Sequence, residues 1–301
     1  MNTTSRRKFL QTASLGVGTT ILSANSLKSQ PRNILSEDRM GVLVDTTVCV
    51  GCRNCEFACK TAHNLPTEPI ESYSDRTVFK KLRRPSDKAL TVVNEFHNPK
   101  NELLPINVKQ QCMHCDHPAC VSACIVGAFN KNENGSVVWD GSKCIGCRYC
   151  MVACPFQVPT FEFDKAIQPE IRKCDFCINR TMEEKLPACV EICPVEALLY
   201  GQRSDLIKEA RSRIKRNPDR YINQIFGEFE VGGTAWMYIG QQKFDTIGFP
   251  NVSTKTAPGV SEAIQHGIFS YFVPPVMFYS ILGMIMWITK RNKVKQEEEE
   301  V

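Results

Sequence analysis

The sequence lacks the motifs by which enzymes that work alone are usually recognised. It has no glycine-rich phosphate-binding loop, no Ser-His-Asp arrangement and no pair of carboxylates spaced for acid–base catalysis. These absences argue against a chain that binds and converts a substrate by itself. We therefore expect that the protein is not an enzyme on its own and depends on partner subunits for any catalytic site.

The sequence also lacks any isolated cysteine, although it contains 16 cysteines. They form four groups of four, so no free thiol and no odd disulfide partner remains. In chain order the groups are Cys49, Cys52, Cys55 and Cys59; Cys112, Cys115, Cys120 and Cys124; Cys144, Cys147, Cys150 and Cys154; and Cys174, Cys177, Cys189 and Cys193.

The third group has the most diagnostic spacing, in the run Cys144-Ile-Gly-Cys147-Arg-Tyr-Cys150-Met-Val-Ala-Cys154-Pro155. Three cysteines at intervals of three residues, a fourth after four more and then proline form the ligand run of a bacterial-type iron–sulfur site. Iron in a sulfide cluster favours soft thiolate ligands. In two-cluster ferredoxins the fourth cysteine binds the other cluster, so this run predicts a partner run elsewhere in the chain.

Two other interpretations of the cysteines fit the spacing less well. Structural zinc uses four tetrahedral ligands, which the repeated x2-x2-x3 spacing suits poorly. Disulfides are natural in exported proteins but require no such spacing.

His114 and His117 lie within the second group and could ligate iron, as in Rieske centres. Because that group already has four cysteines, we expect hydrogen bonding near a cluster or simple exposure for both histidines.

The cysteine groups are also internal repeats. Residues 41–60 align without a gap with residues 136–155, and residues 118–129 align with residues 187–198 as PACVSACIVGAF against PACVEICPVEAL. The chain therefore contains two kinds of half-site, each present twice. This arrangement predicts an α+β fold in which two bacterial-ferredoxin-like units with four cluster sites are interleaved.

We place the four-cluster ferredoxin-like domain at residues 40–265, with an inner two-cluster unit at 105–165. Strands are expected at 41–45, 90–96 and 235–239, where apolar residues alternate or run together. The cysteine-free polar insertion between Lys60 and Lys109 could carry partner contacts or form an ordinary surface excursion, and both alternatives stay open.

Residues 204–216 predict an amphipathic helix with Ser204 as its N-cap and Pro218 beyond its end. Its apolar stripe consists of Leu206, Ile207, Ala210 and Ile214. The basic residues of this helix are expected to form a solvated face, and no nucleic-acid partner is predicted. The formal charge of +5 is no evidence for an anionic partner either. Each four-thiolate cluster would add about −2, so that four clusters would make the loaded protein mildly acidic.

The N-terminus predicts export. Arg6 and Arg7 precede a short apolar stretch, as in a Tat signal peptide, which we place at residues 1–24 with cleavage after Ala24. The Tat pathway carries folded proteins, which suits a protein loaded with clusters before export. We therefore expect the cluster domain on the periplasmic side of the cytoplasmic membrane.

The C-terminal part predicts a single membrane span. Residues 268–289 contain no charged side chain, a length that can cross a bilayer as a transmembrane helix. Four basic residues between Lys290 and Lys295 follow at once, so by the positive-inside rule the tail at 290–301 is cytoplasmic. A buried core helix is the alternative for this stretch. The export signal and the charge bias agree on one topology.

The order of the four groups and the wide gap from Cys177 to Cys189 resemble the four-cluster iron–sulfur subunits of the molybdopterin oxidoreductase and membrane hydrogenase families. The runs CVGCRNC, QCMHCDHPACVSAC, GCRYCMVACPFQVP and LPACVEICP are most similar to the iron–sulfur subunit of hydrogenase-2-type uptake hydrogenases. The Gly232-Gly233-Thr234 stretch, the Gln265-His266 approach to the membrane, the Tat signal and the C-terminal anchor point the same way. The resemblance covers residues 40–289.

The resemblance implies crossed ligation between the groups and four 4Fe–4S clusters, because Cys150 is present where some relatives lose a cysteine and hold a 3Fe cluster. Carried onto this sequence, the four ligand sets are Cys49, Cys52, Cys55 and Cys193 (set 1); Cys174, Cys177, Cys189 and Cys59 (set 2); Cys112, Cys115, Cys120 and Cys154 (set 3); and Cys144, Cys147, Cys150 and Cys124 (set 4).

The implied function is electron transfer within a membrane complex. Electrons from hydrogen, oxidised by a periplasmic nickel–iron hydrogenase, would pass through the clusters to an integral membrane quinone-reactive subunit. One alternative is the same path serving a molybdopterin catalytic subunit of the formate, polysulfide or sulfoxide type. An alternative of another class is a membrane-tethered assembly scaffold with structural clusters. Cluster potentials that the donor of the complex cannot reach would favour the scaffold.

Overall fold

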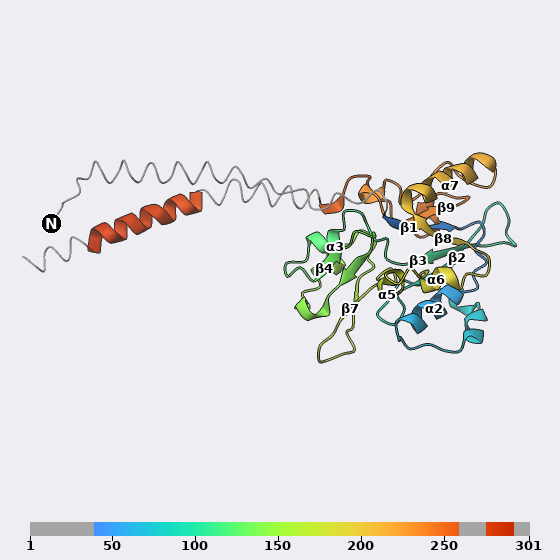
Figure 1. Ribbon diagram of the computed structural model, residues 1–301, viewed down its shortest axis with the longest axis horizontal. Helices are drawn as coiled ribbons and strands as arrows, with labels where there is room; N and C mark the ends of the chain where they lie inside the picture. Colours follow the sequence, from blue (N-terminus) through green and yellow to red (C-terminus); the bar gives the residue numbers. More distant parts are fainter. Residues whose placement is uncertain (1–38, 259–274, 292–301) are drawn as a thin grey trace, which may run out of the picture. The chain divides into compact units, whose positions relative to one another are not determined.

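The computed structural model describes residues 39–258 and 275–291 (Figure 1). The predicted signal peptide with Arg6 and Arg7 therefore lies outside the described residues. So do the first seven positions of the predicted span. Both strands and helices are distributed along the 39–258 part, which makes it a mixed α+β domain, as predicted.

The strands are short and form one three-stranded sheet and three two-stranded sheets within the described residues. The larger sheet has the order β8-β1-β9, with β8 antiparallel and β9 parallel to the central β1. The smaller sheets are the pairs β2-β3, β4-β5 and β6-β7. The strands are β1 (Met40–Asp45), β2 (Val92–Phe96), β3 (Ile106–Gln110), β4 (Phe129–Lys131), β5 (Val137–Trp139), β6 (Thr160–Phe161), β7 (Ile171–Arg172), β8 (Leu198–Gln202) and β9 (Trp236–Ile239).

Within residues 39–258 the helices are short as well, apart from α7. The α-helices are α2 (Asn54–Ala62), α3 (Ala119–Ser122), α4 (Tyr149–Ala153), α5 (Ile178–Thr181), α6 (Ala188–Glu191) and α7 (Arg203–Arg216). Short 3-10 turns lie at η1 (Ile70–Ser74), η2 (Thr77–Lys80), η3 (Gly141–Lys143), η4 (Glu230–Gly232) and η5 (Phe244–Ile247). The three strands expected from the sequence are present as β1, β2 and β9, with bounds shifted by one or two residues.

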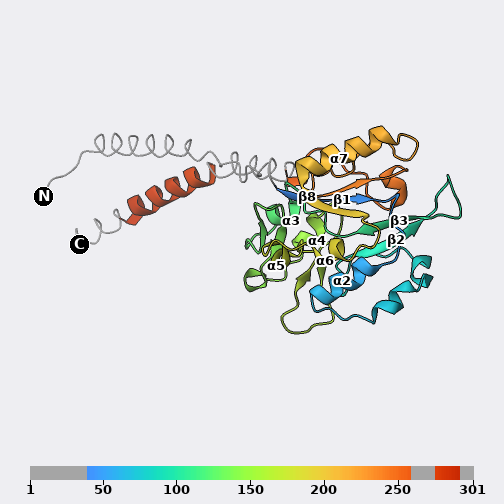
Figure 2. The same ribbon diagram turned by 45° about the vertical axis from the view of Figure 1, so that its right-hand side comes forward.

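The three-stranded sheet is buried on both faces because residues of β1 alternate between two cores. Val42 and Val44 belong to the larger apolar cluster, whereas Leu43 packs with residues of α7 on the opposite face. Figure 2 shows α7 lying along β8 and β1. The predicted stripe of α7 faces this sheet, and its Leu206 and Ala210 are buried.

The predicted N-cap of α7 was wrong. The helix begins at Arg203 with Gln202 in the cap position, and no side chain caps its first turn. The reason lies in Arg203 itself, whose buried guanidinium donates hydrogen bonds to the carbonyl oxygens of Thr234 at 2.8 Å and Gly227 at 3.0 Å. These bonds fix the start of α7 two residues earlier than a capping Ser204 would.

The sequence repeats correspond to repeated local structure. In one copy, β1 leads toward α2, while α6 leads to β8, and β1 pairs antiparallel with β8. In the other, α3 leads to β4 and β5 leads toward α4, with β4 antiparallel to β5. Helix α2 packs on α6, and α3 packs on α4. Each strand pair and its helix pair form a bacterial-ferredoxin-like unit.

The polar insertion after α2 packs against the first cysteine segment. Buried Glu56 of α2 accepts hydrogen bonds from Arg83 at 2.6 Å and from the backbone N–H of Val93 in β2 at 2.7 Å. Arg53, at the start of α2, donates to Glu56 at 3.1 Å and to the carbonyl oxygens of two residues in or after η1. The insertion is therefore built into the domain.

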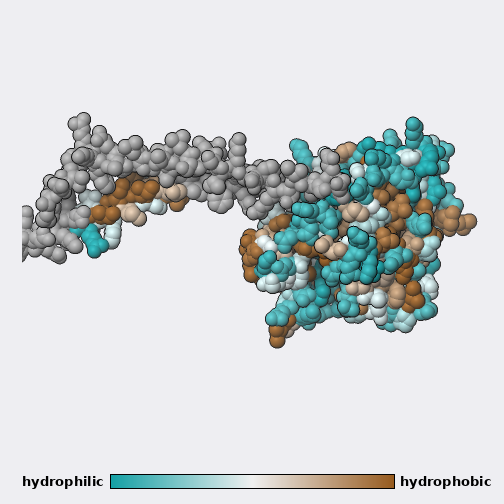
Figure 3. Space-filling view, viewed as in Figure 1, coloured by the Kyte–Doolittle hydropathy of each residue, from teal (hydrophilic) through white to brown (hydrophobic). Residues whose placement is uncertain are grey.

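The tip of the β2-β3 hairpin projects from the domain at the right of Figure 1. Hydrophobic residues appear at this tip in Figure 3, where Leu103 is 89% exposed and Leu104 is exposed as well. Residues 275–291 are helical. Among the residues that the structure describes, no helix is both long enough and apolar enough to cross a membrane.

Candidate metal centres

Set 1 meets at one cavity, although its cysteines come from segments more than a hundred residues apart. Cys49, Cys52, Cys55 and Cys193 line this cavity together. They converge because the antiparallel pairing of β1 with β8 and the packing of α2 on α6 bring the first and fourth cysteine segments together. The structure thus joins the four thiols that the resemblance grouped.

Set 3 lines a second cavity. Cys112, Cys115, Cys120 and Cys154 surround it, again from two segments. Burial raises the pKa of the Cys115 thiol well above its ordinary value, and the neighbouring thiols of Cys112 and Cys154 raise it further. These thiols are therefore close enough to repel one another as anions.

The set 2 thiols are also neighbours. Burial raises the pKa of Cys177 to about 12, with further contributions from Cys189 and Cys59. The pKa of Cys174 is raised well above its ordinary value by burial and then by Cys59. Cys59 belongs to the first cysteine segment and the other three to the fourth, so this set is crossed as well.

Set 4 lies nearest to solvent. Burial raises the pKa of Cys150 to about 11, and Cys124, Cys144 and Cys147 add to the effect. Cys147 is the one exposed cysteine of the described residues. Apolar side chains around this set, among them Val152 and Ile125, are also exposed. This set is accordingly the one that a partner protein could approach most closely.

The spacing between the thiols distinguishes the possible metal groups. No cysteine forms a disulfide. In the described part of the chain, three ligand atoms come within 4.8 Å of one another only at His63, Asp175 and Cys177. A tetrahedral zinc ion with Zn–S bonds near 2.3 Å would hold its thiolates about 3.8 Å apart. No three thiols of a described set lie within 4.8 Å of one another, which is wider than one zinc ion requires, and four soft thiolate donors suit an iron–sulfur group.

His63 and Asp175 satisfy each other without a metal. Their Nε2 and Oδ1 atoms lie 2.8 Å apart, and His63 Nδ1 lies 2.8 Å from the carbonyl oxygen of Cys59. Burial alone would lower the pKa of His63, but the hydrogen bonds with Asp175 and Cys59 and the negative charges of both groups together outweigh burial and raise that pKa to about 11. The pair therefore forms an ionic contact beside set 2.

The two histidines of the second cysteine segment lie in different environments. His114 is fully buried, and its Nδ1 accepts a hydrogen bond from the backbone N–H of Val137 at 2.8 Å. His117 is exposed. Neither belongs to a compact group of metal-ligand atoms within the described residues.

The turn between the first two cysteines of a run needs an unusual backbone. Gly51 and Gly146, equivalent in the repeat, have φ of 70° and 72°. A side chain at Gly51 would also meet the Asn107 Oδ1 atom at 2.3 Å. The residues before α2 and α4, Arg53 and Arg148, likewise have positive φ. These left-handed positions turn the chain around a common point, so that successive thiols can face it.

Backbone N–H groups point at some of the thiols. Ala128 N lies 3.2 Å from Cys124 Sγ, and Gly146 N lies 3.4 Å from Cys144 Sγ. Hydrogen bonds to cluster sulfurs tune reduction potentials. The chain thus supplies both the ligands and the surrounding donors that an iron–sulfur cluster requires.

The sets follow one another in space. Cys55 of set 1 interacts electrostatically with Cys189 of set 2, and Cys174 of set 2 interacts with Cys112 of set 3. Cys120 of set 3 interacts in turn with Cys150 of set 4. Neighbouring thiols therefore connect the sets in the order 1, 2, 3, 4.

Buried lysines lie among these sets, and sequence reasoning missed them. Lys109 of β3 lines the set 1 cavity and is 2% exposed. Buried Lys173 donates a hydrogen bond to the carbonyl oxygen of Cys174 at 2.8 Å. Lysine is rarely buried without a partner, and no motif marks these positions in the sequence. Only the folded chain shows that they face the cysteines.

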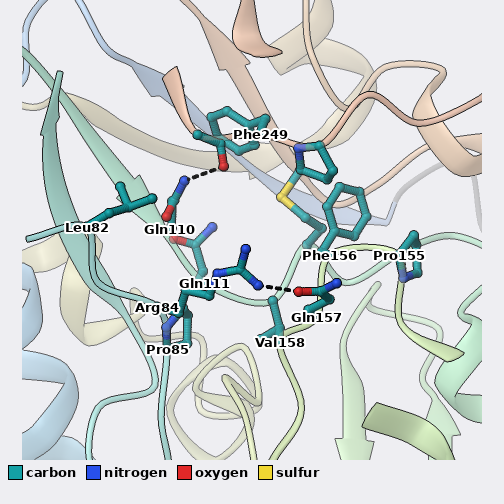
Figure 4. A pocket seen from close by; sticks show the side chains of 13 residues that line it. Leu82, Arg84, Pro85, Gln110, Gln111, Pro155, Phe156, Gln157, Val158 and Phe249 are labelled. Carbon is teal, nitrogen blue, oxygen red and sulfur yellow. Dashed lines mark hydrogen bonds between the residues drawn. The ribbon is translucent and has the colours of Figure 1, made fainter. Parts of the chain in front are cut away.

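A further pocket opens beside set 3 and is drawn in Figure 4. Phe156 and Phe249 contribute aromatic walls, while Arg84 is hydrogen-bonded to Gln157 across it. Gln110 donates to the carbonyl oxygen of Gly248 at 2.9 Å. The polar groups drawn are thus engaged with one another, and no ligand chemistry stands out in this pocket.

Known proteins share this pattern. Residues 106–203 match the 4Fe-4S dicluster domain family. A protein of Nitratidesulfovibrio vulgaris is 49% identical over 257 residues, covering 84% of this chain and 69% of that protein. The hydrogenase-2 operon protein HybA of Escherichia coli O157:H7 is 28% identical over 317 residues, covering 95% of each chain. The nitrate-inducible formate dehydrogenase iron–sulfur subunit of Escherichia coli K12 is 30% identical over 215 residues, covering 70% of each chain.

Proposed function

Because this chain belongs to the family of iron–sulfur electron-transfer subunits with 4Fe–4S clusters, we propose that it carries electrons between a nickel–iron hydrogenase and a quinone-reactive membrane subunit. When bound, the clusters supply centres that accept and release one electron at a time. The protein supplies their ligands, excludes water from them and holds them in sequence. The chain itself contributes no catalytic residue to this function.

Each of the four ligand sets is proposed to hold one 4Fe–4S cluster, with thiolates from two cysteine segments. Burial disfavours an isolated thiolate, so the positive charge of iron is what makes deprotonation of these thiols favourable. Crossed ligation also fastens distant segments together, for example Cys193 of the fourth segment to Cys49 of the first. Cluster binding is therefore expected to stabilise the fold.

The observation that carries this proposal is the sequence of neighbouring thiols from set 1 to set 4. Electrostatic interactions between Cys55 and Cys189, between Cys174 and Cys112, and between Cys120 and Cys150 relate set 1 to set 2, set 2 to set 3 and set 3 to set 4. Structural clusters of a scaffold would need no such order. A continuous row with one end near the surface is what electron transfer between two partners requires.

The hydrogenase partner is supported by the likeness to the hydrogenase-2 operon protein along 95% of both chains. The likeness to a formate dehydrogenase iron–sulfur subunit supports a second candidate, in which the same row of clusters serves a molybdopterin catalytic subunit. Both candidates share the electron path and differ in the catalytic partner.

The proposed location is the periplasmic side of the cytoplasmic membrane. The twin arginines Arg6 and Arg7 support Tat export, and the uncharged stretch 268–289, followed by basic residues, supports a single-pass anchor with a cytoplasmic C-terminus. Conservative Arg6→Lys and Arg7→Lys substitutions together should keep the loaded chain in the cytoplasm. Export of that variant at the normal level would contradict a Tat route.

The experiment that tests the function is purification of the complex from membranes in mild detergent, with metal analysis and mass spectrometry of copurifying proteins. We expect about 16 irons per chain, as four 4Fe–4S clusters require, together with nickel and a hydrogenase large subunit. Molybdenum or tungsten with a pterin-binding subunit would retain the electron path and replace the hydrogenase with the second candidate.

Two results would contradict the electron-transfer proposal itself. One is zinc in place of iron. The other is a full iron content in clusters that hydrogen cannot reduce in a hydrogenase complex, or that formate cannot reduce in a formate dehydrogenase complex. The second result would favour the scaffold alternative.

A further inference from the structure

Lys109 occupies a position between two of the proposed clusters. It lies on β3, is 2% exposed and lines the same cavity as Cys49 and Cys55 of set 1. The charged groups that act on it most strongly are Cys189 of set 2 and Cys55 of set 1. Its ammonium group therefore faces thiols of both sets.

The ammonium group is held in place by a closed set of contacts. Lys109 Nζ donates a hydrogen bond to Gln111 Oε1 at 2.8 Å and lies 4.3 Å from the centroid of the Trp236 ring. Gln111 Nε2 donates to the Tyr238 hydroxyl at 2.7 Å, and that hydroxyl donates to the carbonyl oxygen of Lys109 at 2.9 Å. The side chain thus has a fixed position and not a choice of rotamers.

No carboxylate of the described chain forms an ion pair with Lys109. Two other buried cations have such partners: Arg53 pairs with Glu56 at 3.1 Å, and Lys131 lies 3.9 Å from Asp116. A buried cation without a counter-charge is strongly unfavourable. The anions that remain are the proposed clusters with their thiolate ligands, each with a net charge of about −2 when oxidised.

We propose that Lys109 is a fixed positive charge that compensates the clusters of sets 1 and 2 and raises the reduction potential of both. The inference rests on the proposed four-cluster function and adds a residue that sets potentials within it. Reduction adds one electron to a cluster and makes it more negative. A cation held beside that cluster favours this step by direct Coulomb attraction. A packing role alone would require the aliphatic stem of this side chain and not its charge.

The test is an EPR-monitored redox titration of the purified complex, with dithionite as the reductant. Lys109→Met removes the charge and keeps a side chain of similar length. For two of the four clusters we expect the equilibrium constant for reduction to fall about tenfold. This fall corresponds to a reduction potential that is lower by about 59 mV for a one-electron couple. The clusters of sets 3 and 4 should keep their potentials and serve as an internal control.

Two further variants separate charge from packing. Lys109→Arg retains the charge. The reduction equilibrium constants of the two clusters should therefore stay within about threefold of their normal values, which is a potential shift under half of that expected for Lys109→Met. Lys143→Met removes a lysine next to Cys144, but the Lys143 side chain is 53% exposed, so water screens its charge. We expect no shift in that control.

Several outcomes would overturn the inference. Normal potentials in Lys109→Met would do so, and so would equal shifts of all four clusters. If Lys109→Met lost the clusters of sets 1 and 2 while Lys109→Arg retained them, the charge role would be supported. Loss from both variants would assign Lys109 to packing alone. Absence of iron from the unsubstituted chain would instead overturn the four-cluster function, and this inference with it, so the two failures are distinguishable.

Discussion

The backbone N–H of Asp116 donates a hydrogen bond to the carbonyl oxygen of Gly233 at 2.8 Å. This bond joins the second cysteine segment to the loop before β9. Gly233 has φ of 100° and ψ of 154°, a conformation that is essentially restricted to glycine. A Cβ atom there would also lie 2.5 Å from Asp116 Oδ2 and 3.3 Å from the carbonyl oxygen of Glu228.

Gly233→Ala is therefore expected to destabilise the domain by about 1–3 kcal/mol, through backbone strain and the clash with Asp116. The measurement is the guanidinium midpoint, followed by visible cluster absorbance and far-UV circular dichroism. Gly201→Ala is the matched control, because its Cβ would meet its nearest neighbour, Leu206, at an ordinary 3.8 Å. Equal midpoints for the two variants would refute the proposed role of Gly233.

Glu56→Gln should weaken the attachment of the insertion to the first cysteine segment. The Glu56 carboxylate is 2% exposed and receives hydrogen bonds from Arg53, Arg83 and the Val93 backbone. The neutral amide would leave two guanidinium groups without their counter-charge, at a cost of about 3 kcal/mol. Glu95→Gln, which breaks the more exposed pair with Arg76, should cost under about 1 kcal/mol. Unfolding midpoints of the two variants test this difference.

The Glu56 effect should also depend on pH. Burial alone would raise the pKa of Glu56, but the hydrogen bonds from Arg83 and Arg53 outweigh it and hold that pKa below its ordinary value. The carboxylate therefore stabilises the fold fully above the unfolded pKa of 4.5, and this stabilisation is lost as pH falls through the lower folded pKa. The stability difference between the natural chain and Glu56→Gln should be largest near neutral pH and should shrink in acid. A difference that grew in acid would contradict this assignment.

The cysteine runs could be interpreted as cluster ligands because each run is local in the sequence and its spacing is chemically restrictive, whereas the assignment of ligands across runs followed from the resemblance. A run such as Cys144 to Cys154 leaves few alternatives, and repetition of the runs pointed to paired units. Strand β1 and helix α7 were predictable for a related reason, since each has a clear apolar pattern. The folded chain places the thiols of each expected set near one another.

What the sequence could not indicate depends on contacts between distant segments. Lys109 lies in a strand whose pattern looks ordinary, and burial of its charge follows only when β3 meets the first and fourth cysteine segments. Glu56 likewise gains its arginine partner from the insertion. The wrong cap at Ser204 has the same origin, because the bonds of Arg203 to the loop before β9 decide where α7 begins. Such long-range polar contacts leave no periodic signal.

Removal of the clusters is expected to loosen β3 and α2 more than α7. Without clusters, the Lys109 charge loses its counter-charge and the crossed links between segments disappear. The core between α7 and the three-stranded sheet contains no cysteine and should persist. Hydrogen exchange measured by mass spectrometry on loaded and chelator-treated protein tests this. Faster exchange spread evenly over α7 and β3 would show that the clusters do not stabilise the domain locally.

Paired cysteine substitutions can decide whether ligation is crossed. Set 1 joins Cys55 and Cys193, so Cys55→Ala and Cys193→Ala together should remove the same single cluster as either alone, about four irons per chain. Cys189→Ala and Cys193→Ala together should remove two clusters, about eight irons, because these neighbours belong to sets 2 and 1. Iron analysis and EPR spin counts of the purified variants give the numbers.

If each segment instead held its own cluster, the pattern would be reversed. The pair in one segment would then cost a single cluster, and the pair across segments would cost two. Because both pairs share Cys193→Ala, general damage at that position affects them equally, and the contrast depends on ligation alone.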